Sequence, residues 1–515
     1  MKDKSKNRLR DNDCPVLTAN QMRMADQYSV DVGHISASEL MLHAGQVVAD
    51  AVIRYAEDGG RIVVVTGFGN NAGDGFIAAR LLRKKRIPVT VIPLVPLESL
   101  SDELLKELEF AEEVGVKVRS VISRDDLAVL DEWLRRAAVV VDAIFGTGLN
   151  KPLEGWIGEA VACINRSDRC VLAVDIASGI DADSGKVLGT AIKADFTLPI
   201  AAYKWGHWLN EGRTYRGELL SPAAIGIMDG TLDVMMDKHP FSAVRSYIIN
   251  KNMLGRALPA RGEDTHKKAL GHLWVFGGSQ GYTGAPRLTA AGAQAVGVGL
   301  VSIACPGDVY SIIAGSALEV MVHAQEEATI WHDANAVVAG PGWGRDYAGM
   351  LADLLHSSLA MVLDADALNM VSENSKLTEQ LKRRDALIVM TPHPGEAGRL
   401  LGVSAAEVQK DRLATALALV DKYQGWVVLK GAQTLVVSPN HHVWLCPFGS
   451  ANLAVAGTGD VLAGMIGGLL ATGISPDVAI PAAVGLHAVA GEQSGWHRAG
   501  QLEEIVARLV QKFRG

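Results

Sequence analysis

Apolar residues follow two alternating patterns along the chain, short β-branched runs and longer stretches with helical spacing. From residue 17 to about residue 55, apolar side chains recur every three or four positions, which predicts helix. Short β-branched runs then predict strands at 61–67, 89–94, 138–146, 170–179 and 194–200. Because helical segments such as 101–115 separate these runs, the first part of the chain predicts a doubly wound parallel sheet.

The pattern weakens between residues 226 and 250, and we predict a domain junction at 235–245. A second series of strands is predicted at 272–278, 300–306, 336–342, 360–366, 386–392, 426–432 and 434–439. The turn motifs of the two series differ, so we predict two different α/β domains. They are expected at 17–235 and 245–515, after a disordered tail at 1–16.

Composition agrees with this fold class and limits the possible partners. A chain of 515 residues is too long for a single hydrophobic core of ordinary size, which predicts more than one domain. It is 49% hydrophobic but only 5% aromatic, which is typical of α/β layers. The net charge is −8 and basic residues do not cluster along the chain, so we expect no nucleic-acid partner.

The cysteines and the most apolar segment point to a cytoplasmic protein. The five cysteines form no CxxC pair, which predicts reduced thiols rather than disulfides or a zinc site. The apolar stretch 461–476 is shorter than the roughly 20 residues that a membrane span needs. We therefore expect a buried helix there and no membrane partner.

The first half carries a glycine-rich turn, TGFGNNAGDG, at 66–75. It follows a predicted strand and precedes the helical sequence FIAARLLRKK. Glycines let a ligand approach the backbone, and amides at a helix start attract an anion. Asn and Asp also serve in ordinary turns and caps, so a plain βα turn is the alternative.

Two further strand ends in this half carry polar side chains. Asp142 is followed by Gly146, and Asp175 is followed by Ser178. Ligands bind at the carboxyl ends of strands in open α/β sheets. The oxygens of Asn71, Asp142 and Ser178 could converge on a hard cation.

Four motifs follow one another in this half: GxGNNxGDG, VDAxxGTGL, VDIxSG and a later KxG. In this order they resemble the NAD(P)H-hydrate epimerase domain, the YjeF amino-terminal family, over about 17–235. That family has a Rossmann-like fold. The resemblance implies K⁺ on Asn71, Asp142 and Ser178, and catalytic roles for Asp175 and Lys204. The substrate-binding residues that it implies are Asn70, Asn71, Gly73, Asp74, Gly146, Thr147, Gly148 and Asp175.

Three positions depart from that family's pattern. Ala72 replaces a glycine, Ala177 replaces a proline, and Trp205 stands in the turn after the lysine. A positive φ at Ala72 would cost roughly 1 kcal/mol. None of the three changes removes a proposed ligand or acid–base group.

The second half also places polar residues after predicted strands. TPHPGEA at 391–397 holds His393 and Glu396 in a rigid loop, LDADALN at 363–369 carries two aspartates, and AGPGWG at 339–344 is another glycine turn. LKGAQT at 429–434 supplies a lysine that suits nucleotide phosphates. Each could instead be an ordinary turn.

The segment GTGD at 457–460 precedes the apolar stretch. Its glycines free the amides of Gly457, Thr458 and Gly459 to face a phosphate at a helix start. A carboxylate in that position opposes anion binding unless it acts chemically. Asp460 therefore suits a general base, which deprotonates a hydroxyl as it attacks phosphorus.

Together with GGSxGYTGAPRLTA at 277–290, these motifs resemble the ADP-dependent NAD(P)H-hydrate dehydratase, the YjeF carboxy-terminal domain with a ribokinase-like fold, over about 245–515. The resemblance implies that Gly342, His393 and Asp460 contact the hydrate. The implied nucleotide-binding residues are Lys430, Gly431, Ala432, Gln433, Thr434, Gly457, Thr458 and Gly459. Ala456 departs from the family, which usually has glycine there.

The two resemblances together imply a bifunctional repair enzyme. It would epimerise R- and S-NAD(P)HX and dehydrate the S epimer with ADP, giving NAD(P)H, AMP and phosphate. NADHX, NADPHX and an adenine nucleotide are the expected partners, with Mg²⁺ and K⁺ as cofactors, in a homo-oligomer. The alternatives are a ribokinase-like small-molecule or vitamin kinase, and a nucleotide-binding protein whose epimerase-like domain is inactive. A dehydrogenase is disfavoured because the first glycine loop is not GxGxxG.

Overall fold

The computed structural model describes residues 14–33, 35–56, 60–227, 244–258, 264, 266–316, 318–326 and 331–514. The described chain forms two compact units, within Pro15–Ala243 and within Val244–Gly515. Residues 1–13 of the predicted tail and 235–243 of the predicted junction lie outside the described residues. The predicted tail extended to residue 16, but Cys14–Leu17 form strand β1, whose Val16 and Leu17 are buried.

The first unit contains a seven-stranded sheet in which every neighbouring pair is parallel, in the order β4-β3-β2-β5-β6-β7-β9. β1 pairs separately, and in parallel, with the short strand β8. The other strands are β2 (Arg61–Thr66), β3 (Val89–Pro93), β4 (Lys117–Val118), β5 (Ala137–Ala143), β6 (Cys170–Val174), β7 (Phe196–Leu198), β8 (Tyr203–Lys204) and β9 (Glu218–Leu219).

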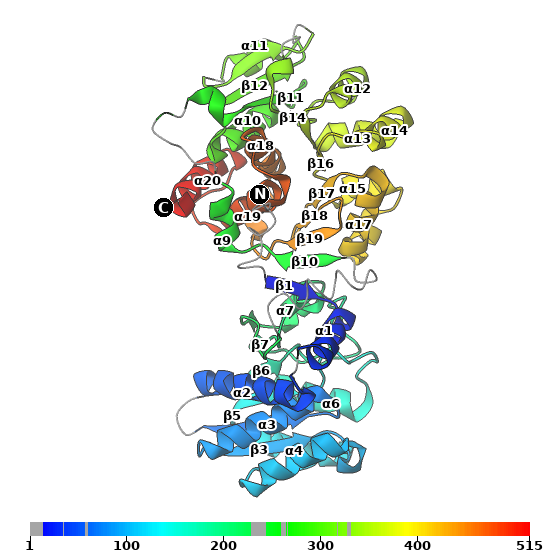
Figure 1. The fold of residues 1–515 in the computed structure, drawn as a ribbon, viewed down its shortest axis with the longest axis vertical. Coiled ribbons are helices and arrows are strands. Elements are labelled where there is room, and N and C mark those ends of the chain that lie inside the picture. Colours follow the sequence, from blue (N-terminus) through cyan, green and yellow to red (C-terminus); the bar gives the residue numbers. More distant parts are fainter. Residues whose placement is uncertain are drawn as a thin grey trace. The chain divides into compact units, whose positions relative to one another are not determined.

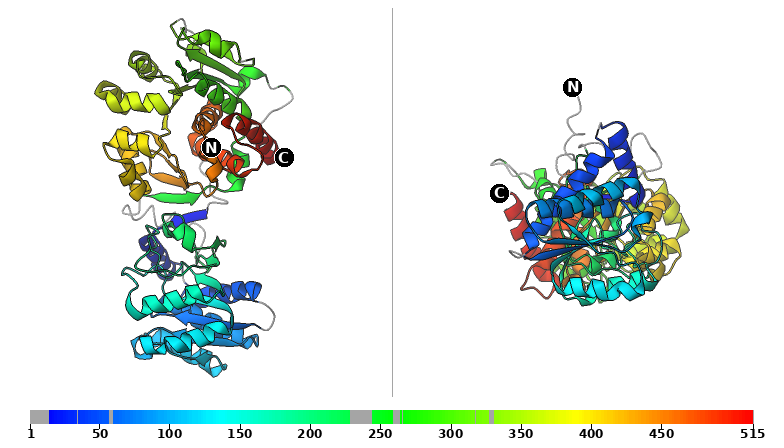
Figure 2. Two further views of the ribbon diagram at one scale, coloured as in Figure 1. Left: turned by 180° about the vertical axis from the view of Figure 1, so that it is seen from behind. Right: turned by 90° about the horizontal axis from the view of Figure 1, so that it is seen from below.

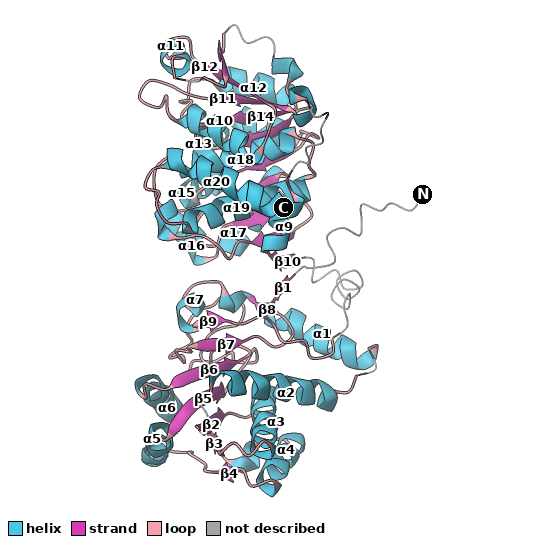
Figure 3. Ribbon diagram, turned by 90° about the vertical axis from the view of Figure 1, so that its left-hand side faces the viewer, coloured by secondary structure: helices cyan, strands magenta, loops and turns pink. Residues whose placement is uncertain are grey.

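Helices cover both faces of this sheet, as the doubly wound pattern predicts. Figure 3 shows α2, α3 and α4 on one face and α5 and α6 on the other, and each face has its own buried apolar cluster. The end-on view in Figure 2 shows the same layers. The helices are α1 (Ala19–Asp31), α2 (Ala37–Tyr55), α3 (Asn70–Lys84), α4 (Asp102–Glu113), α5 (Leu127–Arg135), α6 (Gly155–Arg166) and α7 (Gly212–Tyr215).

The second unit contains a longer sheet in the order β13-β12-β11-β14-β15-β16-β17-β18-β19-β10. β18 is antiparallel to both of its neighbours, and the other pairs are parallel. The strands are β10 (Arg245–Ile248), β11 (His272–Phe276), β12 (Leu300–Cys305), β13 (Met321–Ala324), β14 (Ala336–Ala339), β15 (Ala360–Leu363), β16 (Ile388–Met390), β17 (Trp426–Leu429), β18 (Leu435–Val437) and β19 (His442–Leu445).

Helices lie on both sides of this second sheet. Figure 1 shows α10, α18, α19 and α20 on one side and α12–α15 and α17 on the other. The helices are α9 (Lys251–Arg256), α10 (Ala285–Val296), α11 (Tyr310–Ala314), α12 (Ala348–His356), α13 (Ala365–Glu373), α14 (Ser375–Lys382), α15 (Pro394–Leu401), α16 (Ala405–Lys410), α17 (Arg412–Tyr423), α18 (Thr458–Ala471), α19 (Pro476–Glu492) and α20 (Ala499–Arg514).

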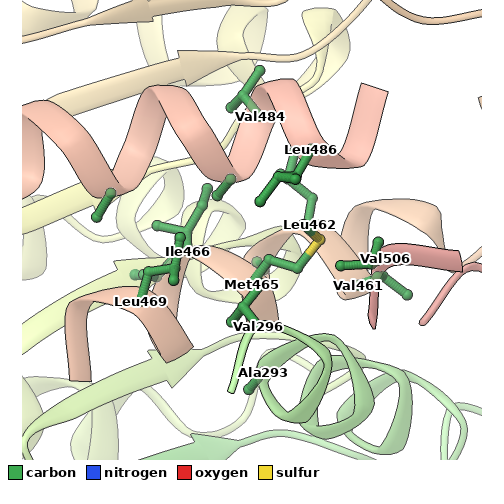
Figure 4. Close-up of a cluster of buried hydrophobic side chains, with 14 of the residues drawn as sticks. Ala293, Val296, Val461, Leu462, Met465, Ile466, Leu469, Val484, Leu486 and Val506 are labelled. Carbon is green, nitrogen blue, oxygen red and sulfur yellow. The ribbon is translucent and has the colours of Figure 1, made fainter. Parts of the chain in front are cut away.

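Helix α18 is the centre of the second core, which confirms the predicted buried helix. Figure 4 shows its side chains Val461, Leu462, Met465, Ile466 and Leu469 among residues of α10, α19 and α20. A Cβ at Gly464 would overlap the Thr289 carbonyl oxygen, so glycine permits close contact with α10. No helix among the described residues is both long and apolar enough to cross a membrane.

Several elements differ from the sequence prediction. The helical pattern predicted over 17–55 forms two helices, α1 and α2, because Ser36 begins a new helix with a capping box. The turn GFGNNAGDG was expected to precede its helix, but α3 already begins at Asn70. Strands β13, β19 and β10 were not predicted. Each has only four residues.

Candidate active sites

The first candidate site lies where β2, β5 and β6 end. These three strands are adjacent and parallel, so their carboxyl ends lie at one edge of the sheet. The helix α3 follows β2 there, Asp142 lies near the end of β5, and Asp175 follows β6 directly. The structure thus brings together the strand-end residues that the sequence singled out.

Asp142 and Ser178 form a fully buried pair within this site. The Ser178 amide donates to Asp142 Oδ2 at 2.8 Å, and the Ser178 hydroxyl donates to Asp142 Oδ1 at 2.6 Å. Burial raises the pKa of Asp142 to about 6 against these hydrogen bonds. Asp142 forms no ion pair with any described Lys, Arg or His, so a cation at this carboxylate would relieve a real electrostatic cost.

Asn71, the third predicted K⁺ ligand, is buried near the same loops. Its side-chain Nδ2 has no hydrogen-bond partner in the structure. A Cβ on Gly146 would lie 3.4 Å from Asn71 Oδ1 and 3.5 Å from Asp175 Oδ2, so Gly146 adjoins both side chains. The residues therefore supply oxygen donors in a buried place, which fits a hard monovalent cation.

Asp175 is held in an uncommon conformation by an ion pair with Lys204. Its φ is 67°, in the left-handed region, which a non-glycine residue adopts at a cost. Lys204 Nζ donates to Asp175 Oδ1 and, at 2.6 Å, to the Ile200 carbonyl. The Ile200 amide donates to the same Asp175 oxygen at 3.1 Å. Lys204 is only 1% exposed, so the Lys204–Asp175 ion pair lies within the protein core.

His207 supports the same pair from behind. Its Nδ1 accepts from the Lys204 amide at 3.0 Å, so Nε2 carries the proton and donates to the Asp175 carbonyl at 2.8 Å. Burial, and then the charge of Lys204, lower the pKa of His207 to about 3. The ring is therefore neutral and fixes the backbone of both residues.

The remaining predicted contacts of the first site fall into two groups. Asn70, Thr147 and Gly148 lie at the accessible edge of the sheet, with Asn70 and Gly148 exposed. Gly73 and Asp74 are buried in α3, and a Cβ on Gly73 would collide with Met41, so this glycine serves helix packing. The anticipated strain at Ala72 is absent because Ala72 is helical, and Ala177 also has no positive φ.

The second candidate site lies where β14, β15, β16 and β17 end, at the start of α18. Lys430 follows β17, and its Nζ donates to Asp364 Oδ1 at 2.7 Å. The Thr391 hydroxyl donates to the same oxygen at 2.7 Å. Glu396 Oε2 lies 4.0 Å from Lys430 Nζ. Burial lowers the pKa of Lys430, but the nearby carboxylates, Asp364 foremost, outweigh it and raise this pKa.

Asp460 lies in the first turn of α18, after Gly457, whose φ of 93° begins the helix. A Cβ on the adjacent Gly459 would lie 3.4 Å from Lys430 Nζ, so the lysine reaches the GTGD segment. Burial, and then the charge of Asp364, raise the pKa of Asp460 to about 7. A carboxyl group with that pKa is suited to accept a proton near neutral pH.

His393 and Gly342, the predicted hydrate contacts, lie in this site. The rigid loop predicted at 391–397 is helical from Pro394 onward, and His393 caps the start of α15. His393 is half-exposed; its Nδ1 accepts from the Gly395 amide at 3.0 Å, and its Nε2 faces Glu396 Oε1 at 3.3 Å. Gly342 has a φ of 57°, and its carbonyl accepts from the Ser279 hydroxyl at 2.9 Å.

The loop 430–434, predicted to contact the nucleotide, is anchored at its base and open at its tip. The Lys430 amide donates to the Pro392 carbonyl at 2.9 Å, which joins this loop to TPHPGEA. Gly431 and Ala432 are exposed, whereas Gln433 and Thr434 are partly buried. The exposed tip of the loop can therefore present its backbone groups to a ligand, while the base of the loop is held in place.

Comparisons with known proteins agree with this arrangement. A family model described as YjeF-related protein N-terminus matches residues 37–206, and one described as NAD(P)H-hydrate dehydratase matches residues 273–503. The bifunctional NAD(P)H-hydrate repair enzyme Nnr of Coxiella burnetii is 35% identical over 480 residues, 92% of this chain and 93% of that protein. The Escherichia coli protein of the same name is 32% identical, over 92% and 88%.

The chain belongs to the bifunctional NAD(P)H-hydrate repair enzyme family. Among solved structures, the ADP/ATP-dependent NAD(P)H-hydrate dehydratase from Bacillus subtilis, co-crystallised with ATP and Mg²⁺, is 29% identical. It covers 52% of this chain and 98% of its own, with a TM-score of 0.47. The predicted enzyme class and the two-part α/β architecture are confirmed.

For this member of the repair family, the sequence did not indicate three residues that the structure brings to the sites, and it gave Asp364 no definite role. Asp26 faces the Asp175–Lys204 pair, and His207 braces it. Asp364, noticed only as a strand-end aspartate, is the direct partner of Lys430. His487 in α19 donates from Nε2 to the Thr458 carbonyl at 2.9 Å and fixes the start of α18. Only His207 lies in a local segment with a residue that it contacts, Lys204, three positions earlier.

Proposed function

We propose that the chain repairs hydrated nicotinamide nucleotides with two active sites. The first unit interconverts R- and S-NAD(P)HX, and the second dehydrates the S epimer at the expense of ADP, giving NAD(P)H, AMP and phosphate. The observation that carries the proposal is Asp460, a half-buried carboxyl group with a pKa of about 7 beside a lysine at the start of a buried helix. Family membership supports the pairing of the two activities.

In the second unit, Asp460 takes the proton of the C6 hydroxyl of the reduced ring as that oxygen attacks the terminal phosphorus of ADP. Lys430 and the amides at the start of α18 stabilise the charge that develops on the phosphoryl oxygens. The phosphorylated oxygen then leaves C6 as phosphate, C5 loses a proton to the departing phosphate, and the ring double bond between C5 and C6 returns. Gly342 and His393 would orient the hydrate, and the backbone of 431–434 would hold the nucleotide.

Mg²⁺ suits this site as a companion of the nucleotide. Among the described residues, no group of three or more His, Cys, Asp or Glu side chains could hold a metal ion, so these side chains alone offer no closed cage. Mg²⁺ commonly keeps waters and binds through phosphates with one or two carboxylates. The buried carboxylate of Glu396 would supply that contact, and the cation would neutralise phosphoryl charge.

In the first unit, we assign Asp175 as the acid–base group and Lys204 as its charged partner. K⁺ would be held by oxygens of Asn71, Asp142 and Ser178, and it would order the loops that carry the substrate contacts. The buried Asp142 carboxylate, which has no ion-pair partner among the described residues, supports this assignment. The substrate would lie against Asn70, Asp74 and the loop 146–148.

A direct assay tests the dehydratase. The purified chain is incubated with S-NADHX and either ADP or ATP, and the near-ultraviolet absorbance of NADH is followed. Appearance of NADH with ADP, together with AMP and phosphate, is the expected result. Absence of NADH, together with phosphorylation of a vitamin alcohol, would replace the proposal with a small-molecule kinase.

We also propose a homo-oligomer in the cytoplasm. The five cysteines are free thiols, which supports a reducing compartment. The edge strand β13 and the segment before it expose Ile312, Leu318 and Met321, an apolar surface of the kind that another subunit covers. Light scattering after size exclusion measures the oligomeric state, and a monomeric mass would contradict this part.

A further inference from the structure

Helix α1 carries a carboxyl group that the assigned roles leave unused. Asp26 lies on its partly buried side, directly after the fully buried Ala25. In the described part of the chain, the Asp26 carboxylate has no hydrogen-bond or ion-pair partner. A partly buried carboxyl group without a partner is costly, and such groups occur where they act on a ligand.

The position of α1 is fixed by contacts at its start and along its side. Thr18 and Gln21 form a capping box, and the Ala19 amide donates to Asp183 Oδ1 at 2.6 Å. Ala25 packs in one buried cluster with Ala202, two residues before Lys204. α1 is therefore held beside the strand β8, where the catalytic lysine lies.

This packing places Asp26 in the electrostatic field of the first site. Its charge interacts with those of Lys204 and Asp175, and with that of Asp74 from α3. Burial, the largest cause, raises the pKa of Asp26 to about 6. Asp175, in contrast, is paired directly with Lys204. The two carboxyl groups thus lie in different surroundings, as the acid and the base of one reaction require.

We propose that Asp26 is the second acid–base residue of the epimerase site and acts opposite Asp175. This inference rests on the proposed epimerase function. In the R-to-S direction, the Asp26 proton goes to the C6 hydroxyl, the C6–O bond breaks, and water leaves. The ring nitrogen lone pair forms a C=N bond, which leaves a cationic ring. A water molecule then adds to C6 on the other face, returns the electron pair to nitrogen, and gives its proton to Asp175.

Asp74 is a weaker candidate for this role. It is 8% exposed and lies within the packed first turns of α3, whereas Asp26 is more accessible. Asp74 is therefore expected to act on the site through its charge, and Asp26 by contact with the reacting hydroxyl.

The test compares Asp26→Asn with Asp31→Asn, a matched change at an exposed position of the same helix. Conversion of R- to S-NADHX is measured by chromatography without ADP, above the no-enzyme background. We expect Asp26→Asn to slow conversion by about 10²–10⁴-fold and Asp31→Asn to leave it unchanged. Dehydration of S-NADHX with ADP, performed by the other unit, should be the same in all three proteins.

The pH profile separates an acid from a structural residue. The wild-type rate should fall as pH rises through about 6, because Asp26 loses the proton that it donates. The rate of Asp26→Asn should not show this fall with rising pH. Asp26→Glu should restore the fall, together with part of the wild-type epimerisation rate. Asp26→Asn within threefold of wild type, or an unchanged limb in Asp26→Asn, would overturn the inference. A wild-type protein without epimerisation above background would instead overturn the proposed function.

Discussion

The two candidate sites both combine an aspartate with a lysine at the ends of parallel strands, but they commit the lysine differently. In the first site, Lys204 pairs directly with Asp175. In the second, Lys430 pairs with Asp364, and Asp460 has a pKa of about 7. The lysine thus pairs with the proposed catalytic carboxyl group itself in the first site, and with a neighbouring carboxylate in the second.

This difference fits the two proposed reactions. In the proposed epimerisation, Asp175 accepts and returns a proton, and Lys204 stays beside it as a charged partner. A residue that must take a proton from a poorly acidic hydroxyl benefits from a higher pKa. A further carboxylate, Asp364, helps to give Asp460 this higher pKa. It pairs with Lys430, and its negative charge disfavours ionisation of Asp460.

The largest effect is expected from Asp460→Asn. An amide cannot accept the hydroxyl proton, so the dehydration rate should fall by about 10²–10⁴-fold. Nucleotide binding and epimerisation should be retained. NADH formation from the S epimer measures the loss, with Asp346→Asn, an exposed change, as the control. Dehydration that survives in Asp460→Asn would remove the general-base role.

Lys204→Met should cause the next largest change, in stability as well as activity. It leaves Asp175 buried without its counter-ion, which typically costs about 3–5 kcal/mol. Hydrogen exchange across β6 and β8 should show easier local opening, and epimerisation should be lost. Lys193→Met, at an exposed position, should change neither. Unchanged exchange in Lys204→Met would mean that the pair contributes no net stability.

Asp364→Asn should make the second site resemble the first. Lys430 would lose its partner and become available to Asp460, whose pKa should fall. Dehydration requires ionised Asp460, so the wild-type rate falls as pH drops through about 7, and this limb should move to lower pH in the variant. The variant also loses the hydrogen bond between Lys430 and the charged Asp364, an interaction of about 1.5–3 kcal/mol. Lys430 is then no longer held in place, which should raise the KM for ADP. Asp353→Asn is the exposed control; an unmoved limb would argue against the coupling.

Gly464→Ala should give the smallest effect, on the core beneath the second site. The added Cβ would overlap the Thr289 carbonyl oxygen, and such overpacking costs about 1–3 kcal/mol. Gly349→Ala in α12, where a Cβ meets nothing within 4 Å, should be neutral or slightly stabilising. Thermal unfolding of the two variants measures the difference, and equal melting temperatures would contradict the close contact.

Much of the fold and part of each site followed from local patterns. The β-branched runs located the central strands, and the strand-end residues Asp142, Asp175 and Ser178 lie together as expected. The helical start at Asn70 was hidden because the four glycines and two asparagines of GFGNNAGDG are typical of a loop. The two of these glycines that lie in α3 are instead required by packing, as Gly73 against Met41 illustrates.

The missed residues depend on contacts between distant parts of the chain. Asp26 reaches residues 175 and 204, and His487 binds the carbonyl of a residue in another helix. No spacing in one sequence encodes such pairs, because they arise only when helices pack on the sheet. Likewise, the lysine in KGAQT was predicted to face the nucleotide, and nothing local indicated that it would be held by Asp364.

The glycine-rich contact between α10 and α18 has a consequence for engineering. Because the proposed base stands on a helix that touches its neighbour through backbone, randomising α18 to alter substrate preference would mostly yield unstable protein. The tip of the loop 430–434, where Gly431 and Ala432 are exposed, borders the same site without forming its core. Directed evolution of new substrates should therefore diversify that tip and leave α18 and Lys430 constant.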